Sequence, residues 1–312
     1  MGTRRTYSPE TLGLFFGFIG TLGFSLTFPA TRVAVAALHP TVVGLGRAVV
    51  AAILAGALLL ITRQRRPTAA ELRGLLLVVA GAIFAFPLLS AWALRRVPSA
   101  HGAVIIGLLP LATALAGVLL VGEWPSPRFW LFSLLGSAAV VGYAIYDGAG
   151  RFQTADLALL GAVVGASLAY AEGARLSRTL GSWQVICWAL VCALPLLLPP
   201  TALAVREYGL QAPPTAWLGF AYVALVSQFT AFFPWYRGLA LGGVARVGQM
   251  QLLQPFLTLF ASALLLGEHV SLATVGFALL VVGTVVLGRK AVVKRSEPDP
   301  ASPKPDGEAS KA

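Results

Sequence analysis

Long stretches without charge constrain this chain more than any other feature of its sequence. Segments of at least 18 residues without Asp, Glu, Lys or Arg are 11–31, 74–94, 97–122, 129–146, 179–205, 208–236, 247–267 and 269–288. A helix that spans a bilayer needs about 20 mostly apolar residues. With 57% hydrophobic and 11% charged residues, the composition excludes an ordinary soluble domain. The segments lack the alternation of a membrane β-barrel, so the expected class is an all-α integral membrane protein.

Two further segments complete the expected set of membrane helices. Residues 40–62 are interrupted by Arg47, and residues 156–178 carry Glu172 and Arg175. The sequence therefore predicts ten transmembrane helices, near 12–31, 40–62, 72–94, 99–121, 128–146, 156–178, 183–200, 215–237, 245–266 and 270–288.

One segment occurs twice, at an offset of 145 residues. Residues 110–123 read PLATALAGVLLVGE and residues 255–268 read PFLTLFASALLLGE, so a proline and a Gly-Glu pair match. Two copies of five helices each require the second copy to enter the membrane from the opposite side, because five is odd. We expect two inverted five-helix repeats, over 12–146 and 156–288, a construction typical of secondary transporters.

The basic residues predict the orientation. With an inner N-terminus, 15 Lys and Arg residues lie near the inner helix ends and 5 near the outer ones. The positive-inside rule then places both termini in the cytoplasm. Residues 1–11 are expected to form a cytoplasmic N-terminal segment, and 289–312 a disordered cytoplasmic tail. The net charge of +11 is spread over short loops, so no nucleic-acid partner is expected.

Small residues at helical spacing recur early in each repeat, as Gly13-x-x-x-Gly17 and Gly161-x-x-x-Gly165. This spacing permits close contact between helices. We interpret both motifs as packing sites within the chain, with dimerisation as the alternative.

Several motifs together resemble the EamA family of the drug/metabolite transporter superfamily. Arg47, early in the second helix, resembles an arginine often found there. The other motifs are ALRRVPSA at 93–100, Gly122-Glu123, Arg237-Gly238-Leu239-Ala240, Gln254-Pro255 and Gly267-Glu268. The resemblance covers roughly 12–288 and implies transport of small metabolites, frequently amino acids or related compounds, by alternating access. The first helix departs from the pattern, because Phe24-Ser25 replaces the Trp-Gly pair of many relatives.

Two charged residues within the predicted helices are the first candidates for a functional site. Ionisable groups at membrane depth are costly and usually face a cavity or a partner. Arg47 is expected to attract an anionic substrate group or to organise the outer gate, and the alternative is a bond to helix-end carbonyls. Glu172 is a candidate to bind a coupling proton or a substrate amine. Its alternative is an ion pair with Arg175, one turn away.

Glutamines form a second group of candidates, which the first repeat lacks. Gln249, Gln251 and Gln254 fall in the ninth predicted helix, and Gln228 falls in the eighth. Gln251 and Gln254 share one helix face, while Gln249 points elsewhere. An amide both donates and accepts hydrogen bonds, so these residues suit a zwitterionic ligand. Hydrogen bonds between helices are the alternative.

Aromatic residues and prolines complete the candidates. Trp92, Tyr170 and Tyr236 are expected to form cavity walls, with packing or contact with lipid as the alternative. Pro110 and Pro255 occupy matching positions in the two repeats. We expect them to be paired kinks that help the two halves rock.

The sequence favours a transporter over an enzyme. Its three histidines are far apart, its two cysteines lie on different faces of one helix, and it has no metalloprotease or nucleotide-binding motif. We expect a secondary transporter that exports a small metabolite, an amino acid or a related compound, across the inner membrane. The partners are the substrate, lipids and a proton as candidate coupling ion, and no metal or other cofactor is expected. Alternatives are a multidrug or toxic-compound exporter and an integral membrane enzyme acting on lipid-linked substrates.

Overall fold

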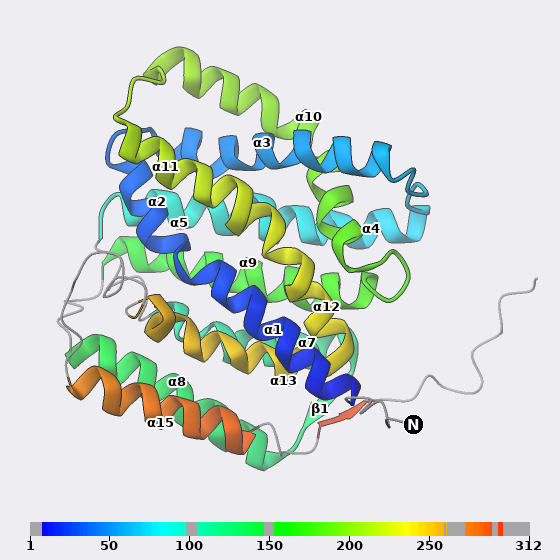
Figure 1. The fold of residues 1–312 in the computed structure, drawn as a ribbon, viewed down its shortest axis with the longest axis vertical. Helices are drawn as coiled ribbons and strands as arrows, with labels where there is room; N and C mark the ends of the chain where they lie inside the picture. The colour runs from blue at the N-terminus through cyan, green and yellow to red at the C-terminus, as the bar shows by residue number, and fades with distance from the viewer. Residues whose placement is uncertain are drawn as a thin grey trace, which may run out of the picture.

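The computed structural model describes residues 8–97, 105–146, 153–258, 260, 272–288 and 293–295, and these are almost entirely helical. The helices run side by side, so that their ends gather at two opposite ends of the molecule (Figure 1). The described helices that are long and apolar enough to cross a membrane are Pro9–Val35, Pro40–Ile61, Ala69–Leu94, Thr154–Leu176, Ser182–Tyr208 and Pro214–Gly242. The predicted all-α class is confirmed.

We call a continuous helical span made of consecutive elements a rod. In the first half of the chain, the rods at 9–35 and 69–94 each combine more than one helix. The elements in order are α1 (Pro9–Ser25), α2 (Thr27–Val35), α3 (Pro40–Ile61), α4 (Ala69–Val78), the π-helix η1 (Val79–Ala85), α5 (Phe86–Leu94), α7 (Leu109–Val121), β1 (Glu123–Pro125) and α8 (Pro127–Tyr146). Side chains mark the helix starts. The hydroxyl groups of Ser8 and Thr68 cap α1 and α4, and Thr68 forms a capping box with Glu71.

The second half follows the same plan. Its elements are α9 (Thr154–Leu176), α10 (Ser182–Tyr208), α11 (Pro214–Tyr222), the π-helix η2 (Val223–Thr230), α12 (Phe232–Gly242), α13 (Val244–Gly248), the 3-10 helix η3 (Gln249–Leu253), α15 (Leu272–Gly288) and β2 (Val293–Arg295). Residues 254–258 continue η3 as an α-helix. Moving η1 by the repeat offset gives 224–230, so the two π-helices occupy equivalent positions.

Helices that are one repeat apart pack on each other. α3 lies along α10, and α8 lies along α15, with which it forms a pair at the lower edge of Figure 1. In addition, α1 packs along α12, and α9 packs along η1 and α5. The first rod of each half thus contacts the third rod of the other half, a reciprocity expected of two repeats related by a twofold axis.

Glycines permit the crossings between α1 and α12 and between α9 and η1. A Cβ atom added to Gly13 would lie 2.4 Å from the backbone nitrogen of Gly242. One added to Gly81 would lie 2.1 Å from the carbonyl oxygen of Gly165. Any side chain at Gly13 or Gly81 would clash, so these helices meet backbone to backbone. The two small-residue motifs of the sequence therefore contribute to packing inside the chain.

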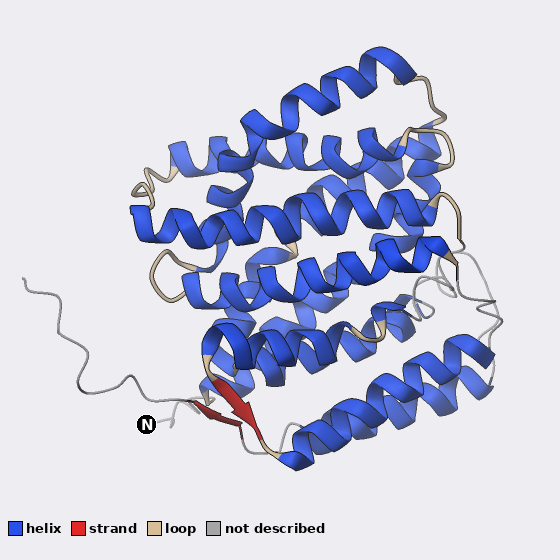
Figure 2. Ribbon diagram, turned by 180° about the vertical axis from the view of Figure 1, so that it is seen from behind, coloured by secondary structure: helices blue, strands red, loops and turns tan. Residues whose placement is uncertain are grey.

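The described chain ends lie at one end of the bundle. β1 and β2 pair antiparallel, with Glu123 opposite Arg295, and Glu10 forms an ion pair of 2.7 Å with Arg246. Figure 2 shows the two strands, drawn in red, at one end of the helical bundle. The expectation of disorder through 289–312 is wrong at 293–295, where β2 pairs with a strand of the first half. The rest of that segment lies outside the described residues.

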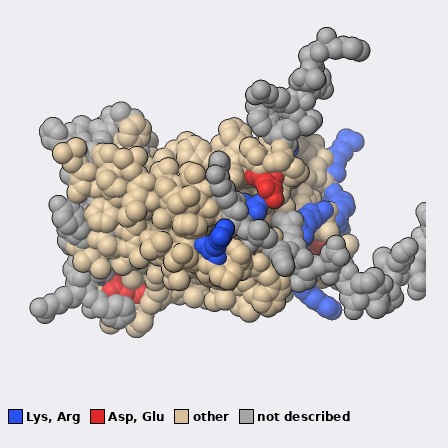
Figure 3. All heavy atoms as spheres, turned by 90° about the horizontal axis from the view of Figure 1, so that it is seen from below, with Lys and Arg blue, Asp and Glu red and all other residues tan. Residues whose placement is uncertain are grey.

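The surface between the two ends is apolar. Leu119, Leu203 and Leu218 are among many large apolar side chains that are exposed along the helices. In the space-filling view, most of the visible Lys and Arg residues lie toward one end of the molecule, and most of the remaining described surface is uncharged (Figure 3). Such a belt matches the hydrocarbon region of a bilayer, where side chains contact lipid.

Candidate functional site

A small cavity lies inside the bundle, and both halves of the chain contribute to its lining. Its volume is about 20 Å³, which is room for about one water molecule. Both π-helices reach it, and such irregular segments are frequent at functional sites. The lining residues are Phe24, Thr27, Arg47, Ala82, Phe86, Ile106, Leu109, Ala166, Tyr170, Ser227, Gln228, Phe232 and Gln254.

Arg47 is the charged residue of this lining. It lies on the buried face of α3, and only 2% of its surface is exposed. Its guanidinium group forms no hydrogen bond or ion pair with the described part of the chain, and its Nε atom is completely buried. Removing an ion from water costs several kcal/mol unless a partner compensates. A buried, unpaired guanidinium beside a cavity is suited to bind an anionic ligand.

Two glutamines present hydrogen-bond acceptors beside the cavity. Nε2 of Gln228 donates to the carbonyl oxygen of Ala82 in η1, and Nε2 of Gln254 donates to the carbonyl oxygen of Phe24 in α1, both at 3.3 Å. Because a backbone carbonyl only accepts, these bonds determine which end of each amide faces the backbone. The two amide oxygens have no hydrogen-bond partner in the described chain.

Hydroxyl groups and a third amide add to the polar lining. Thr27 Oγ1 and Ser227 Oγ are 2.9 Å apart, which joins α2 to η2. Tyr170 is buried, and its ring packs edge-on against Trp235 with centroids 5.2 Å apart. The buried Gln251 side chain lies beside the Tyr170 hydroxyl, but neither amide atom makes a well-formed hydrogen bond within the described residues.

Three other predicted site residues lie away from this cavity. Gln249 donates from Nε2 to Ser133 Oγ of α8, at 2.9 Å. Tyr236 is fully buried and donates to the carbonyl oxygen of Ala169. Trp92 is 36% exposed. The guanidinium carbon of Arg96 lies 3.7 Å from the centre of the Trp92 ring. Trp92 borders a separate pocket of about 570 Å³ near the outer end predicted from the sequence.

Glu172 does not line the cavity either. Its carboxylate accepts hydrogen bonds from Arg175 Nε at 2.8 Å and from Arg175 Nη2 at 2.5 Å. The Glu172 side chain is buried, while half of the Arg175 side chain is exposed. Gly74 of α4 faces this carboxylate, and a Cβ atom there would lie 2.1 Å from Glu172 Oε1. The structure therefore contains the ion pair that was the alternative interpretation of Glu172.

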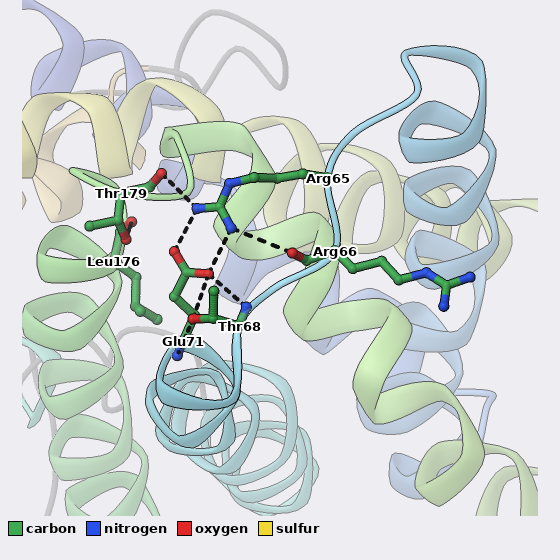
Figure 4. A network of polar contacts seen from close by, with 6 residues as sticks. All are labelled: Arg65, Arg66, Thr68, Glu71, Leu176 and Thr179. Atoms are coloured by element: carbon green, nitrogen blue, oxygen red, sulfur yellow. Dashed lines mark hydrogen bonds and ion pairs between the residues drawn. The ribbon is translucent and has the colours of Figure 1, made fainter. Parts of the chain in front are cut away.

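A second paired carboxylate lies near the same end of the bundle. Glu71 accepts hydrogen bonds from the two terminal nitrogens of Arg65, at 2.9 Å and 2.7 Å. Arg65 also donates to the carbonyl oxygen of Thr179, so the network joins the start of α4 to the turn after α9 (Figure 4). The hydrogen bonds that Arg65 donates to Glu71 raise the pKa of Arg65. This network connects the two halves outside the cavity.

The Gly-Glu pair of the first repeat has a structural function that sequence reasoning missed. Gly122 ends α7 in the left-handed conformation, with φ of 68°, and turns Glu123 into the protein. The fully buried Glu123 carboxylate accepts hydrogen bonds from the backbone nitrogens of Val244 and Ala245, at 3.0 Å and 2.8 Å. The pair therefore caps the start of α13 in the other half. Its recurrence in the sequence at 267–268, after a second predicted helix, is the signal that points to this function.

Pro110 and Pro255 follow irregular segments in both halves. Pro110 is in the first turn of α7, directly after a turn at 107–108, and Pro255 follows η3. The neighbours on their N-terminal sides, Leu109 and Gln254, both line the cavity. A change of helix direction at either proline would move a wall of the cavity.

The fold and its polar, partly charged central cavity define a membrane transport protein. The model of the EamA-like transporter family matches residues 11–145 and 153–288. The chain therefore belongs to this family, and it is a multi-pass protein of the bacterial inner membrane.

Individual relatives extend over nearly the same length. The chain is 48% identical over 280 residues to the Uncharacterized transporter YdeK of Bacillus subtilis, covering 90% of this chain and 98% of the relative. It is 29% identical over 279 residues to a Probable terminal-alkyne amino-acid exporter of Streptantibioticus cattleyicolor, covering 86% and 91%. A solved crystal structure matches with a TM-score of 0.73 at 20% identity, covering 89% of this chain and 98% of the other. This last match shows a shared fold alone.

Proposed function

We propose that the protein is a secondary transporter that exports an amino acid or a related small metabolite by alternating access, with the central cavity as its substrate site. Membership of the EamA-like transporter family supports the transport function. The name of one relative, at 29% identity, supports amino-acid export as the activity.

The single observation that carries this proposal is the unpaired guanidinium of Arg47 in the cavity. A carboxylate is the anionic group that all amino acids share, and a guanidinium binds it with two parallel hydrogen bonds. Binding would also remove the cost of leaving a charge unpaired away from water, which makes the contact selective for an anionic group.

The proposed architecture is ten membrane helices in two inverted repeats, at 12–146 and 156–288, with residues 1–11 and 289–312 in the cytoplasm. Reciprocal packing between the halves supports it. Contacts among the segments that were predicted to be cytoplasmic also support this architecture. Contacts join Glu10 to Arg246, β1 to β2, and Arg65 to Thr179, and Figure 1 draws these segments at one end of the bundle.

Transport requires this cavity to change size. About 20 Å³ cannot hold an amino acid, so the helices around it must separate on one side to admit a substrate. We propose that Pro110 and Pro255 are the paired hinge positions. A proton is the proposed coupling ion, and Arg47, Gln228 and Gln254, rather than Glu172, are proposed to bind the substrate.

Exchange in proteoliposomes tests the proposal. Purified protein would be reconstituted with a labelled mixture of amino acids inside, and release would be followed with and without an imposed pH gradient. We expect saturable release of a subset of amino acids, accelerated by external substrate, and none from liposomes without protein. Release of lipophilic cations without release of any amino acid would favour a multidrug exporter instead.

A further inference from the structure

Two pairs of equivalent positions in the repeats contribute opposite chemistry to the cavity. Leu109 and Gln254 are counterparts at the repeat offset, and so are Ala82 and Ser227, and all four line the cavity. In each pair the first repeat supplies an apolar side chain and the second supplies a polar one. An internal repeat with equivalent helices on both sides has thus produced a cavity with two unlike walls.

We name the first of these the polar wall, which consists of Thr27, Arg47, Ser227, Gln228 and Gln254. Its members lie on elements that contact one another. A hydrogen bond joins Thr27 to Ser227, α3, which carries Arg47, packs against η2, and Gln254 donates to the carbonyl oxygen of Phe24 in α1. The wall offers one cationic donor, the guanidinium group, and two amide oxygens that have no partner within the described residues. This combination matches a zwitterion, with the carboxylate at Arg47 and the ammonium at the amide oxygens.

The second wall, the apolar wall, consists of Phe86, Ile106, Leu109 and Ala166. These residues come from α5, α7 and α9 and the segment before α7, and α9 packs along both α5 and α7. None of these side chains carries a hydrogen-bonding group. A polar group placed here would lose its water without gaining a partner, whereas an apolar group would gain contacts.

We propose that Leu109, with Ile106 beside it, selects amino acids whose side chain is apolar. The inference rests on the proposed function and names the substrate class of that cavity: an α-amino acid with an uncharged, apolar side chain. Arg47 binds its carboxylate, the oxygens of Gln228 and Gln254 bind its ammonium group, and the apolar wall contacts its side chain once the cavity has widened.

A single exchange between the repeats tests the role of the apolar wall. Leu109→Gln installs the residue of the second repeat, and the matched control Leu109→Met stays apolar at similar volume. Exchange of internal labelled leucine would be measured against external leucine and external glutamine, which are similar in size. We expect the wild-type protein and Leu109→Met to prefer leucine by about tenfold or more, and Leu109→Gln to lose about tenfold of that preference.

A second variant tests the polar wall independently. Gln254→Leu removes one amide oxygen, and its matched control is Gln249→Leu, since Gln249 bonds Ser133 away from the cavity. The competitor is 4-methylpentanoate, which is leucine without its amino group. We expect Gln254→Leu to lose several-fold of the preference for leucine over 4-methylpentanoate and Gln249→Leu to keep it. Unfolding temperatures of all variants confirm that the proteins are folded.

The outcomes separate this inference from the proposed function. Changed preferences in Leu109→Gln and Gln254→Leu, with unchanged preferences in the two controls, support both. If the wild-type protein exchanges amino acids but Leu109→Gln or Gln254→Leu keeps the wild-type preference, the inference is overturned and the transport function stands. If the wild-type protein exchanges a related small metabolite but no amino acid, only the inference is overturned, and if it exchanges neither, both are overturned.

Discussion

Buried charges near the end of the bundle that carries β1 have partners within the protein, whereas the buried charge in the central cavity has none in the described chain. Near that end, Glu71 is bonded to Arg65, Glu172 to Arg175, and Glu123 to two backbone nitrogens of α13. In the cavity, Arg47 is at least as deeply buried as Glu71 and Glu172, yet it has no partner in the described chain. A charge that a fold needs for its own stability is paired within the fold. A charge kept unpaired is available to a ligand.

The largest effect is expected for Arg47→Met, which removes the unpaired charge. Exchange should fall by about 100-fold or more, because the substrate carboxylate loses its partner. Stability should stay the same or rise, since an uncompensated buried charge is replaced by an apolar side chain. Exchange rates and unfolding temperatures would be measured on the same preparation. Loss of exchange together with a fall in unfolding temperature would instead assign Arg47 a structural role.

Glu123→Ala tests the contrasting end of the molecule. It leaves the buried backbone nitrogens of Val244 and Ala245 without the carboxylate they bond, which should lower the free energy of unfolding by about 2 kcal/mol. Denaturation in detergent would measure this, with Glu10→Ala as control, because the Glu10 side chain is 64% exposed. The Glu123→Ala protein should keep the substrate preference of the wild type, and a changed preference would move Glu123 from a structural role to substrate recognition.

Glu172→Gln should have a smaller effect. The freed Arg175 is half exposed and can be solvated, so we expect a loss of about 1 kcal/mol of stability. Transport should continue with and without a pH gradient. If the variant exchanged substrate normally but no longer responded to the gradient, Glu172 would be the site of the coupling proton, as the other sequence-based interpretation holds.

The smallest effect is expected at the end opposite to β1. The His39 ring stacks on Tyr208 with centroids 3.8 Å apart, and burial together with the positive charge of Arg95 lowers the pKa of His39 below its usual 6.5. The unfolded chain then binds the proton more readily, so stability should be complete above pH 6.5 and should fall as the pH decreases below it. His39→Gln should flatten this pH dependence of the unfolding temperature. An equal slope in the variant would exclude His39 as its source.

Much of the fold was predictable, because membrane helices must be long and apolar. Some predicted helix boundaries differ from those in the structure. The first rod continues past Arg32 to Val35, since the Arg32 guanidinium donates a hydrogen bond to the carbonyl oxygen of Leu94. α10 continues through Pro199 and Pro200 to Tyr208 instead of ending near 200. The π-helices follow from tertiary packing, such as the close approach of η1 to α9, and the sequence carries no periodic signal for them.

The candidate site was predictable only for its most polar members. Arg47, Gln228 and Gln254 were found because charges and amides are rare and costly in membrane helices. Thr27 and Ser227 were missed, since a small hydroxyl residue in an apolar helix often bonds its own backbone. The sequence analysis assigned Gln249, Trp92 and Tyr236 to the site, but they lie away from the cavity. Their rotation about the helix axis and their depth depend on packing, which the sequence does not specify.

The most direct test of the central claim is whether Arg47 recognises a carboxylate. Thermal stabilisation of the purified protein would be titrated with the amino acid that it exchanges best and with the neutral amide of that amino acid. We predict that the wild-type protein needs about tenfold or more of the amide for equal stabilisation, and that Arg47→Met responds equally to both compounds. Unchanged discrimination in the Arg47→Met protein would contradict the assignment of this cavity as the carboxylate-binding substrate site.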